Sequence, residues 1–104
     1  RMVYNLVENG IKYNHFGGQV TVTAYRKGKN ICLSVEDTGS GIPDELKERV
    51  FEPFFRVDKS RSRELGGVGL GLALVREIVR VHDGSITVQS GPSGGTVFDV
   101  VFTQ

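Results

Sequence analysis

The chain has 104 residues, of which 38% are apolar and 24% charged, the composition of one water-soluble globular domain. Its 13 basic and 12 acidic residues give a net charge of +1, which excludes the strongly basic surface of a nucleic-acid-binding protein. A single cysteine, Cys32, excludes an internal disulfide and a multi-cysteine metal site. No apolar run approaches the roughly 18 residues of a membrane span. We therefore expect a cytoplasmic domain that makes no membrane contact of its own.

The first predicted element is an amphipathic helix over residues 2–13. One side of its helical wheel is apolar, with Met2, Val3, Leu6, Val7, Ile11 and Tyr13. The other side is polar, with Arg1, Asn5, Glu8, Asn9 and Lys12. Asparagine is a poor helix former, so two of them one turn apart invite a functional explanation. Their amide oxygens suit Mg²⁺ and the nearby lysine suits a phosphate, although an ordinary solvated helix face is the alternative.

Two alternating strands follow in "QVTVTAYRKGKNICLSVED", joined by a turn that contains glycine. The second strand ends on Asp37, which Gly39 and Gly41 follow in "VEDTGSGIP". A carboxylate beside such bare backbone can accept a hydrogen bond from a flat polar ligand such as a nucleotide base. The alternative is an Asp-Gly turn, which is very common.

The second half of the chain reads as a short helix, a loop, a longer helix and a hairpin. "GIPDELKERVF" begins the short helix, with Pro43 in its first turn. Residues 55–68 are polar and aperiodic and predict a loop. An apolar helix runs from Leu70 to about Val81 and ends at "HDG". "SITVQS" and "TVFDVVFT" close the chain as a hairpin around "GPSGG".

The stretch "LGGVGLGLALVREIV" places four glycines against the start of the longer helix. It is not a P-loop, because Gly-Lys-Ser/Thr is absent, and its glycine spacing does not fit a dinucleotide fingerprint. Free backbone N–H groups at a helix N-terminus nevertheless make an anion site that glycines leave open. A flexible loop that ends at a helix is the alternative.

The order of these elements predicts an α/β fold. We expect a two-layer sandwich in which about three helices lie on one face of a mixed sheet.

Together and in this order, the motifs resemble those of the ATP-binding catalytic domain of bacterial sensor histidine kinases. These domains belong to the wider gyrase, kinase and mismatch-repair ATPase superfamily, which has the Bergerat ATP-binding fold. "NLVENGIKY" resembles the N box, "DTGSGIP" the first glycine box and "FEPFFRVD" the phenylalanine box. "GGVGLGLALVREIVRVHDGSITVQS" resembles the second glycine box with its following segment. The resemblance covers nearly all of residues 1–104.

The resemblance implies that the domain binds ATP or ADP with Mg²⁺. Asn9 would be the metal ligand, with Asn5 beside it, and Lys12 would meet a phosphate. Tyr13 would face the adenine, and Asp37 would accept a hydrogen bond from the adenine amino group. The pocket around that carboxylate would be shaped by Gly39 and Gly41.

The resemblance also assigns the triphosphate to the second glycine box. The backbone of Gly67, Val68, Gly69, Leu70 and Gly71 would hold the phosphates. Two basic side chains would counter charge near the γ-phosphoryl group, Arg56 and, as a second candidate, Arg61. The phenylalanine box would pack below this segment or meet a partner helix through Phe51, Phe54 and Phe55.

The partners implied are a helical dimerisation domain that carries the phosphoacceptor histidine, and a downstream response regulator. The acceptor's sequence context is absent from this chain, so we expect a kinase fragment that cannot label itself. The resemblance also implies a membrane-anchored intact protein and an upstream strand. Without that strand, we expect an exposed sheet edge, reduced stability or dimerisation. Gly10, where the family often has alanine, should loosen the first helix by up to about 1 kcal/mol without touching the site.

Two other functions are compatible with parts of the sequence. Clamp ATPases of the same superfamily carry glutamate four residues before the metal-binding asparagine, as the base that activates water. Here that position is Asn5, which cannot take a proton from water, and Glu8 lies about 100° from Asn9 around the helix. The other alternative is a degenerate domain that binds a protein but no nucleotide. The presence of Asn9 and Asp37 argues against it.

Overall fold

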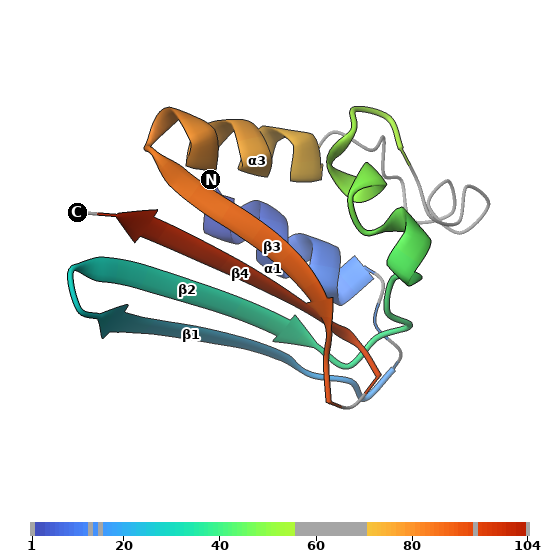
Figure 1. The fold of residues 1–104 in the computed structure, drawn as a ribbon. Helices are drawn as coiled ribbons and strands as arrows, with labels where there is room; N and C mark the ends of the chain where they lie inside the picture. Colours follow the sequence, from blue (N-terminus) through green and yellow to red (C-terminus); the bar gives the residue numbers. More distant parts are fainter. Residues whose placement is uncertain (1, 13, 15, 56–70, 93, 104) are drawn as a thin grey trace.

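The computed structural model describes residues 2–12, 14, 16–55, 71–92 and 94–103, with the side chain of Lys12 excepted. Its two α-helices are α1 (Met2–Lys12) and α3 (Gly71–Val81), and between them lie two short 3-10 helices, η1 (Asp44–Leu46) and η2 (Arg49–Phe51). The strands are β1 (Val20–Lys27), β2 (Asn30–Asp37), β3 (Gly84–Ser90) and β4 (Thr96–Thr103). The four predicted strands and the first and last predicted helices are present within a residue or two of their expected bounds. The predicted middle helix is the pair η1 and η2 (Figure 1).

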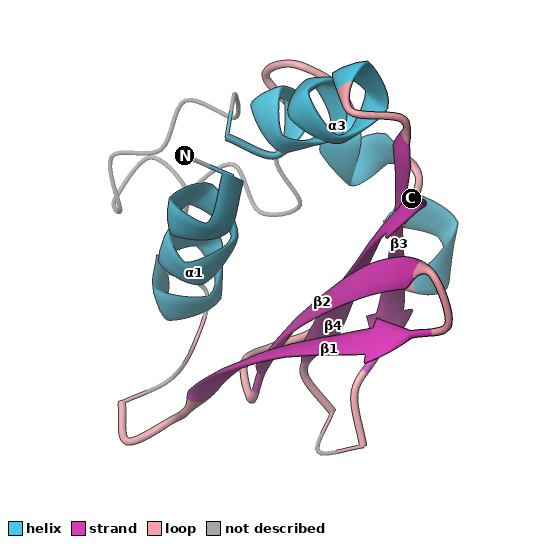
Figure 2. Ribbon diagram, turned by 90° about the vertical axis from the view of Figure 1, so that its left-hand side faces the viewer, coloured by secondary structure: helices cyan, strands magenta, loops and turns pink. Residues whose placement is uncertain are grey.

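The four strands form one sheet in the order β1-β2-β4-β3, and α1 and α3 cover the same face of it (Figure 2). This confirms the α/β two-layer architecture. All three strand pairings are antiparallel, so the described strands do not make the expected mixed sheet. The physical reason is the position of β4. The crossover through α3 returns β3 in the same direction as β2, but β4 lies between them and pairs antiparallel with both.

The core lies between the helices and the sheet. Its fully buried side chains include Leu6 of α1, Val75 and Val79 of α3, and Phe98 and Val100 of β4. The ring of Phe51 from η2 meets that of Phe98 edge to face, with 6.1 Å between their centroids. The core therefore joins both helices, η2 and the centre of the sheet into one packed unit.

The buried side of α1 matches only part of the apolar face expected from the helical wheel, since Met2 and Val7 pack against the core. Leu6 is fully buried, but Val3 and Ile11 are 41% and 63% exposed. Asn5 and Asn9, which the wheel assigned to a polar face, are half-buried. The helix is thus rotated toward its asparagine side.

The strand β1 is an edge of the sheet, and seven of its eight residues are exposed. The expected consequence, association between chains, stays a prediction. Within the described residues, the model has no helix that is both long and apolar enough to cross a membrane.

Candidate functional site

Three predicted motifs and the start of β4 lie at one end of the sheet. There β2 ends at Asp37, β4 begins at Thr96, α1 ends at Lys12 and α3 begins at Gly71 (Figure 1). The motifs come from separate parts of the chain, so the fold brings them together. This end of the molecule is the candidate site.

The carboxyl group of Asp37 lies within the fold, and the residue is only 6% exposed. Its Oδ1 accepts hydrogen bonds from the backbone N–H groups of Gly39 at 2.9 Å and Thr96 at 3.3 Å. No hydrogen bond from the described residues reaches Oδ2. The carboxyl is therefore held through one oxygen, and the other remains available as an acceptor.

Burial raises the pKa of the Asp37 carboxyl above its ordinary value, because the charged form loses hydration. The N–H groups of Gly39 and Thr96 oppose part of this rise, since they stabilise the charged form. A further hydrogen-bond donor at the second oxygen would stabilise the charged form of this carboxyl. A buried, backbone-oriented carboxylate is suited to read the donor pattern of a flat polar ligand.

Two glycines allow the backbone to pack tightly around this carboxyl. A Cβ at Gly95 would lie 2.0 Å from the carbonyl oxygen of Asp37. Gly41 has φ +76°, and a Cβ there would lie 2.7 Å from the carbonyl oxygen of Gly94. The turn between β3 and β4 therefore closes directly on the segment that follows β2.

Gly10 also reaches the site, so the expectation that it does not is wrong. A Cβ at this position would lie 3.4 Å from the Cβ of Asp37 and 3.2 Å from Cγ2 of Val20. Gly10 is buried where α1 crosses the beginning of β1 and the end of β2. The reason is the rotation of α1, which turns this position onto the sheet.

The sequence reasoning missed the contribution of the β3–β4 turn. Thr96 is 3% exposed, and its N–H orients Asp37 across 59 positions of the chain. "GPSGG" was read only as a hairpin turn. The register of β2 against β4 is the signal that could have identified Thr96. In that register Glu36 pairs with Val97, which places residue 96 beside Asp37.

Asn5 and Asn9 occupy one flank of α1, as predicted. Nδ2 of Asn5 is buried and has no hydrogen-bond partner among the described residues. A buried amide without a partner is costly, so an external group that completes its contacts would be favourable. The donor set of two neutral amides fits a hard cation such as Mg²⁺ together with phosphate oxygens. Among the described residues, no group of three or more His, Cys, Asp and Glu side chains offers a metal site.

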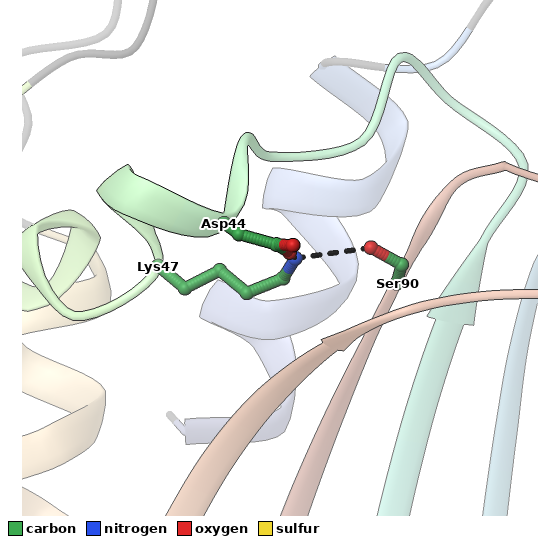
Figure 3. A network of polar contacts seen from close by, with 3 residues as sticks. All are labelled: Asp44, Lys47 and Ser90. Atoms are coloured by element: carbon green, nitrogen blue, oxygen red, sulfur yellow. Dashed lines mark hydrogen bonds and ion pairs between the residues drawn. The ribbon is translucent and has the colours of Figure 1, made fainter.

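Polar and aromatic contacts fix the segment between the two glycine boxes. Nζ of Lys47 donates to Oγ of Ser90 at 3.0 Å and pairs with Asp44, which ties η1 to the end of β3 (Figure 3). The guanidinium of Arg76 on α3 lies 5.6 Å from the centre of the buried Phe51 ring. The η1–η2 segment is thereby held to both layers of the fold.

The phenylalanine box divides into buried and exposed rings. Phe51 is in the core, and Phe55 is partly buried with the guanidinium of Arg49 over its ring at 4.7 Å. Phe54 has φ +66° and is 69% exposed. Phe51 and Phe55 thus pack in or against the core, whereas Phe54 is available at the surface.

Several predicted site residues lie outside the described part of the chain. Of Lys12, only the backbone, at the end of α1, is described, and Gly71 is the first residue of α3. The residues that fall outside are Tyr13, Arg56, Arg61, Gly67, Val68, Gly69 and Leu70.

Comparison with known proteins places the chain among ATPases. The family model described as "Histidine kinase-, DNA gyrase B-, and HSP90-like ATPase" matches residues 1–104. The sensor-like histidine kinase SenX3 of Mycobacterium tuberculosis is 51% identical over 94 residues, which are 90% of this chain and 23% of SenX3. The chain therefore spans about a quarter of the length of this relative.

Solved structures agree with the sequence comparison. The mycobacterial sensor histidine kinase MprB superposes with a TM-score of 0.86 at 34% identity, over 98% of this chain and 69% of that one. The nucleotide-free catalytic domain of histidine kinase ThkA gives a TM-score of 0.82 at 33% identity, over 98% of this chain and 64% of that one.

Proposed function

We infer the function from the family to which the chain belongs, that of the histidine kinase-, DNA gyrase B- and HSP90-like ATPases. Within this family the chain is of the histidine kinase type. We propose that it binds Mg-ATP and supplies the γ-phosphoryl group to a histidine on a separate helical dimerisation domain. This transfer would be the first step of two-component signal transduction.

The observation that carries the proposal is the carboxyl of Asp37. It is buried at a strand end, its Oδ1 is occupied by two backbone donors, and its Oδ2 receives no hydrogen bond from the described residues. An adenine amino group is a donor of the right kind for that oxygen. The glycines around it let the backbone of the β3–β4 turn pack against the segment that carries this carboxyl. Tyr13 would face the adenine ring.

The metal would be held by Asn9, with Asn5 beside it. These two amides would hold Mg²⁺, which would supply positive charge to the phosphates of the nucleotide. The buried Nδ2 group of Asn5, a donor without a partner among the described residues, would suit a phosphate oxygen beside that metal. This chain's own part is to orient the two amides from one flank of α1, which the burial of Leu6 and Gly10 fixes against the sheet.

The triphosphate would lie between the end of α1 and the start of α3. Lys12 and the backbone of residues 67–71 would contact its oxygens, with Arg56 and Arg61 near the γ-phosphoryl group. Support for these roles is the resemblance of motifs, together with the position of Gly71 at a helix N-terminus. Charge neutralisation and alignment are the main requirements of phosphoryl transfer.

A kinase, not a hydrolase, is favoured by the residue at position 5. Asn5 cannot accept a proton from water, so bound ATP would await an outside nucleophile. That nucleophile would be the histidine of the helical domain, docked near the exposed Phe54. ThkA has been solved in complex with the response regulator TrrA, which supports such a regulator as the next partner. The domain would be cytoplasmic within a membrane-anchored protein.

The test is calorimetric titration with ADP and ATP, with and without Mg²⁺, combined with an assay of phosphate release. We expect Mg²⁺-dependent binding, negligible phosphate release, and loss of binding in Asp37→Asn. The matched control is Asp99→Asn, on a neighbouring strand with its side chain on the opposite face of the sheet. Steady hydrolysis would favour a clamp ATPase, and absence of binding by folded protein would favour a scaffold without nucleotide.

A further inference from the structure

The connection after α1 is fastened to the residue that follows Asp37. The fastening is a cluster of hydrogen bonds among three residues, which we call the clasp. These residues are Asn14, Gln19 and Thr38. The function proposed above uses none of them. Thr38 is nevertheless part of the first glycine box, and the clasp joins it to the connection that follows α1.

Each bond of the clasp has a defined direction. The Nδ2 group of Asn14 donates to the carbonyl oxygen of Gln19 at 2.8 Å. The N–H of Gln19 donates to Oγ1 of Thr38 at 2.9 Å, and this hydroxyl donates to Oδ1 of Asn14 at 3.1 Å. The backbone N–H of Thr38 also donates to the carbonyl of Gln19 at 3.2 Å. The Thr38 hydroxyl is thus both acceptor and donor, and only an amide at position 14 supplies both of its own contacts.

Gly18 provides the space that the clasp needs. A Cβ at this position would lie 2.1 Å from Oδ1 of Asn14. Because the obstructed atom is at the end of a side chain, an alanine there would displace the amide and leave the backbone in place. The clasp can therefore be opened without removing any of its polar groups.

Thr38 is bonded directly to Asp37 and precedes Gly39, whose N–H holds Oδ1 of the carboxyl. On the other side, the carboxyl is held by the N–H of Thr96. The clasp fixes the peptide that presents the Gly39 donor, and Thr96 fixes the second donor. Release of Thr38 would free one of the two groups that orient the carboxyl.

We propose that Asn14 and Thr38 are positioning residues that aim the free oxygen of Asp37 at the adenine amino group. The proposal rests on the assignment of Asp37 to the base, and it names the structural source of base selectivity. The clasp touches no nucleotide itself. It acts through the Thr38–Gly39 backbone on the carboxyl.

The test compares affinity for ADP with affinity for inosine diphosphate, which has a carbonyl oxygen where adenine has the amino group. The variants are Thr38→Val, which removes the hydroxyl at nearly constant shape, and Gly18→Ala, which displaces the Asn14 amide. Thr38→Ser restores the hydroxyl. The matched control is Thr23→Val, at an exposed position of β1.

We expect Thr38→Val and Gly18→Ala to weaken ADP binding about threefold to tenfold, the effect of one hydrogen bond, with little change for inosine diphosphate. The selectivity for ADP then falls, whereas Thr38→Ser and Thr23→Val retain it. Equal losses for both nucleotides, or unchanged selectivity in both variants, would overturn the proposal. Absence of any selectivity in the unmodified chain would instead refute the role of Asp37.

Discussion

At the residue scale, the ligand-free protein keeps its most important polar groups in an unfavourable state. The carboxyl of Asp37 is buried with one oxygen unused, and Nδ2 of Asn5 is buried without a partner among the described residues. Both states cost stability, because each group loses hydration that the protein replaces only in part. The proposed ligand supplies the missing partners, an amino group for one and a metal-bound phosphate for the other. The proposed function would therefore explain why two polar groups that cost stability lie at this end of the sheet.

Asp37→Asn should stabilise the ligand-free protein at neutral pH, while it abolishes nucleotide binding. The folded-state pKa of the carboxyl is raised by burial, so the wild-type contribution is fully present below the unfolded value and is lost as pH rises through the raised one. Asparagine keeps an oxygen for the two backbone donors and carries no charge. Urea denaturation of both proteins between about pH 3 and pH 8 would measure the difference, which should vanish at the acid end. A difference that does not depend on pH would contradict this account, and Asp99→Asn is the control.

At the element scale, the site depends on the close approach of α1, β2 and the β3–β4 turn. Gly10 lets α1 lie on Val20 and Asp37, and Gly95 lets the turn lie on the backbone of Asp37. The two contacts differ in the kind of atom that an added methyl group would meet. An added methyl at position 10 would meet the side chain of Val20 at the start of an edge strand, whereas at position 95 it would meet backbone. The same substitution is therefore expected to have opposite effects at the two positions.

Gly10→Ala should raise the free energy of unfolding by up to about 1 kcal/mol, the gain in helix propensity. The Cγ2 atom of Val20 must yield by a few tenths of an ångström, and an edge position at the beginning of β1 permits that movement. Thermal denaturation would show a higher midpoint. A lower midpoint would mean that the start of β1 is held as firmly as the core.

Gly95→Ala should lower the free energy of unfolding by about 1–3 kcal/mol, the usual cost of overpacking, and weaken nucleotide binding with it. The cause is that the carbonyl oxygen of Asp37 cannot move without breaking the end of β2. Gly91→Ala in the same turn is the matched control, because a Cβ there would meet Cγ2 of Val97 at an ordinary 3.4 Å. Equal stability of the two variants would refute the contact.

At the scale of the whole molecule, one sheet with both helices on the same face places every described site element at one end. The core of Leu6, Val75 and Phe98 joins the two layers and so sets the distance between α1 and the sheet. The other end of the sheet, where β1 ends at Lys27 and β2 begins at Asn30, carries none of these described elements. The domain is therefore suited to present a nucleotide at one end to a separate partner.

Mg-ATP should stabilise the whole chain as its concentration rises, by about 2.7 kcal/mol at a hundred times the dissociation constant. Incubation with ATP labelled at the γ-phosphate should leave the chain itself unlabelled, because the proposed acceptor histidine belongs to another domain. A thermal-shift series and autoradiography on the same sample would measure both. Incorporated label would show that a residue of this chain is an acceptor.

Local sequence patterns are enough to predict the elements and the order of the motifs. Hydrophobic periodicity identified α1, α3 and the four strands, and turn residues such as Gly28 marked their ends, because these signals depend on neighbours in the chain. The position of Asp37 at a strand end, beside glycines, followed from the same local signals.

Only the tertiary structure decided which faces and loops complete the site. The rotation of α1, the insertion of β4 between β2 and β3, and the contact of Thr96 with Asp37 all join residues far apart in the chain. The clasp of Asn14 with Thr38 is of the same kind. Such contacts arise when complete elements pack together, and no local pattern encodes them. Periodicity left a solvated helix face open as the alternative for the asparagines of α1, whereas in the structure both are half-buried and Gly10 packs against Asp37.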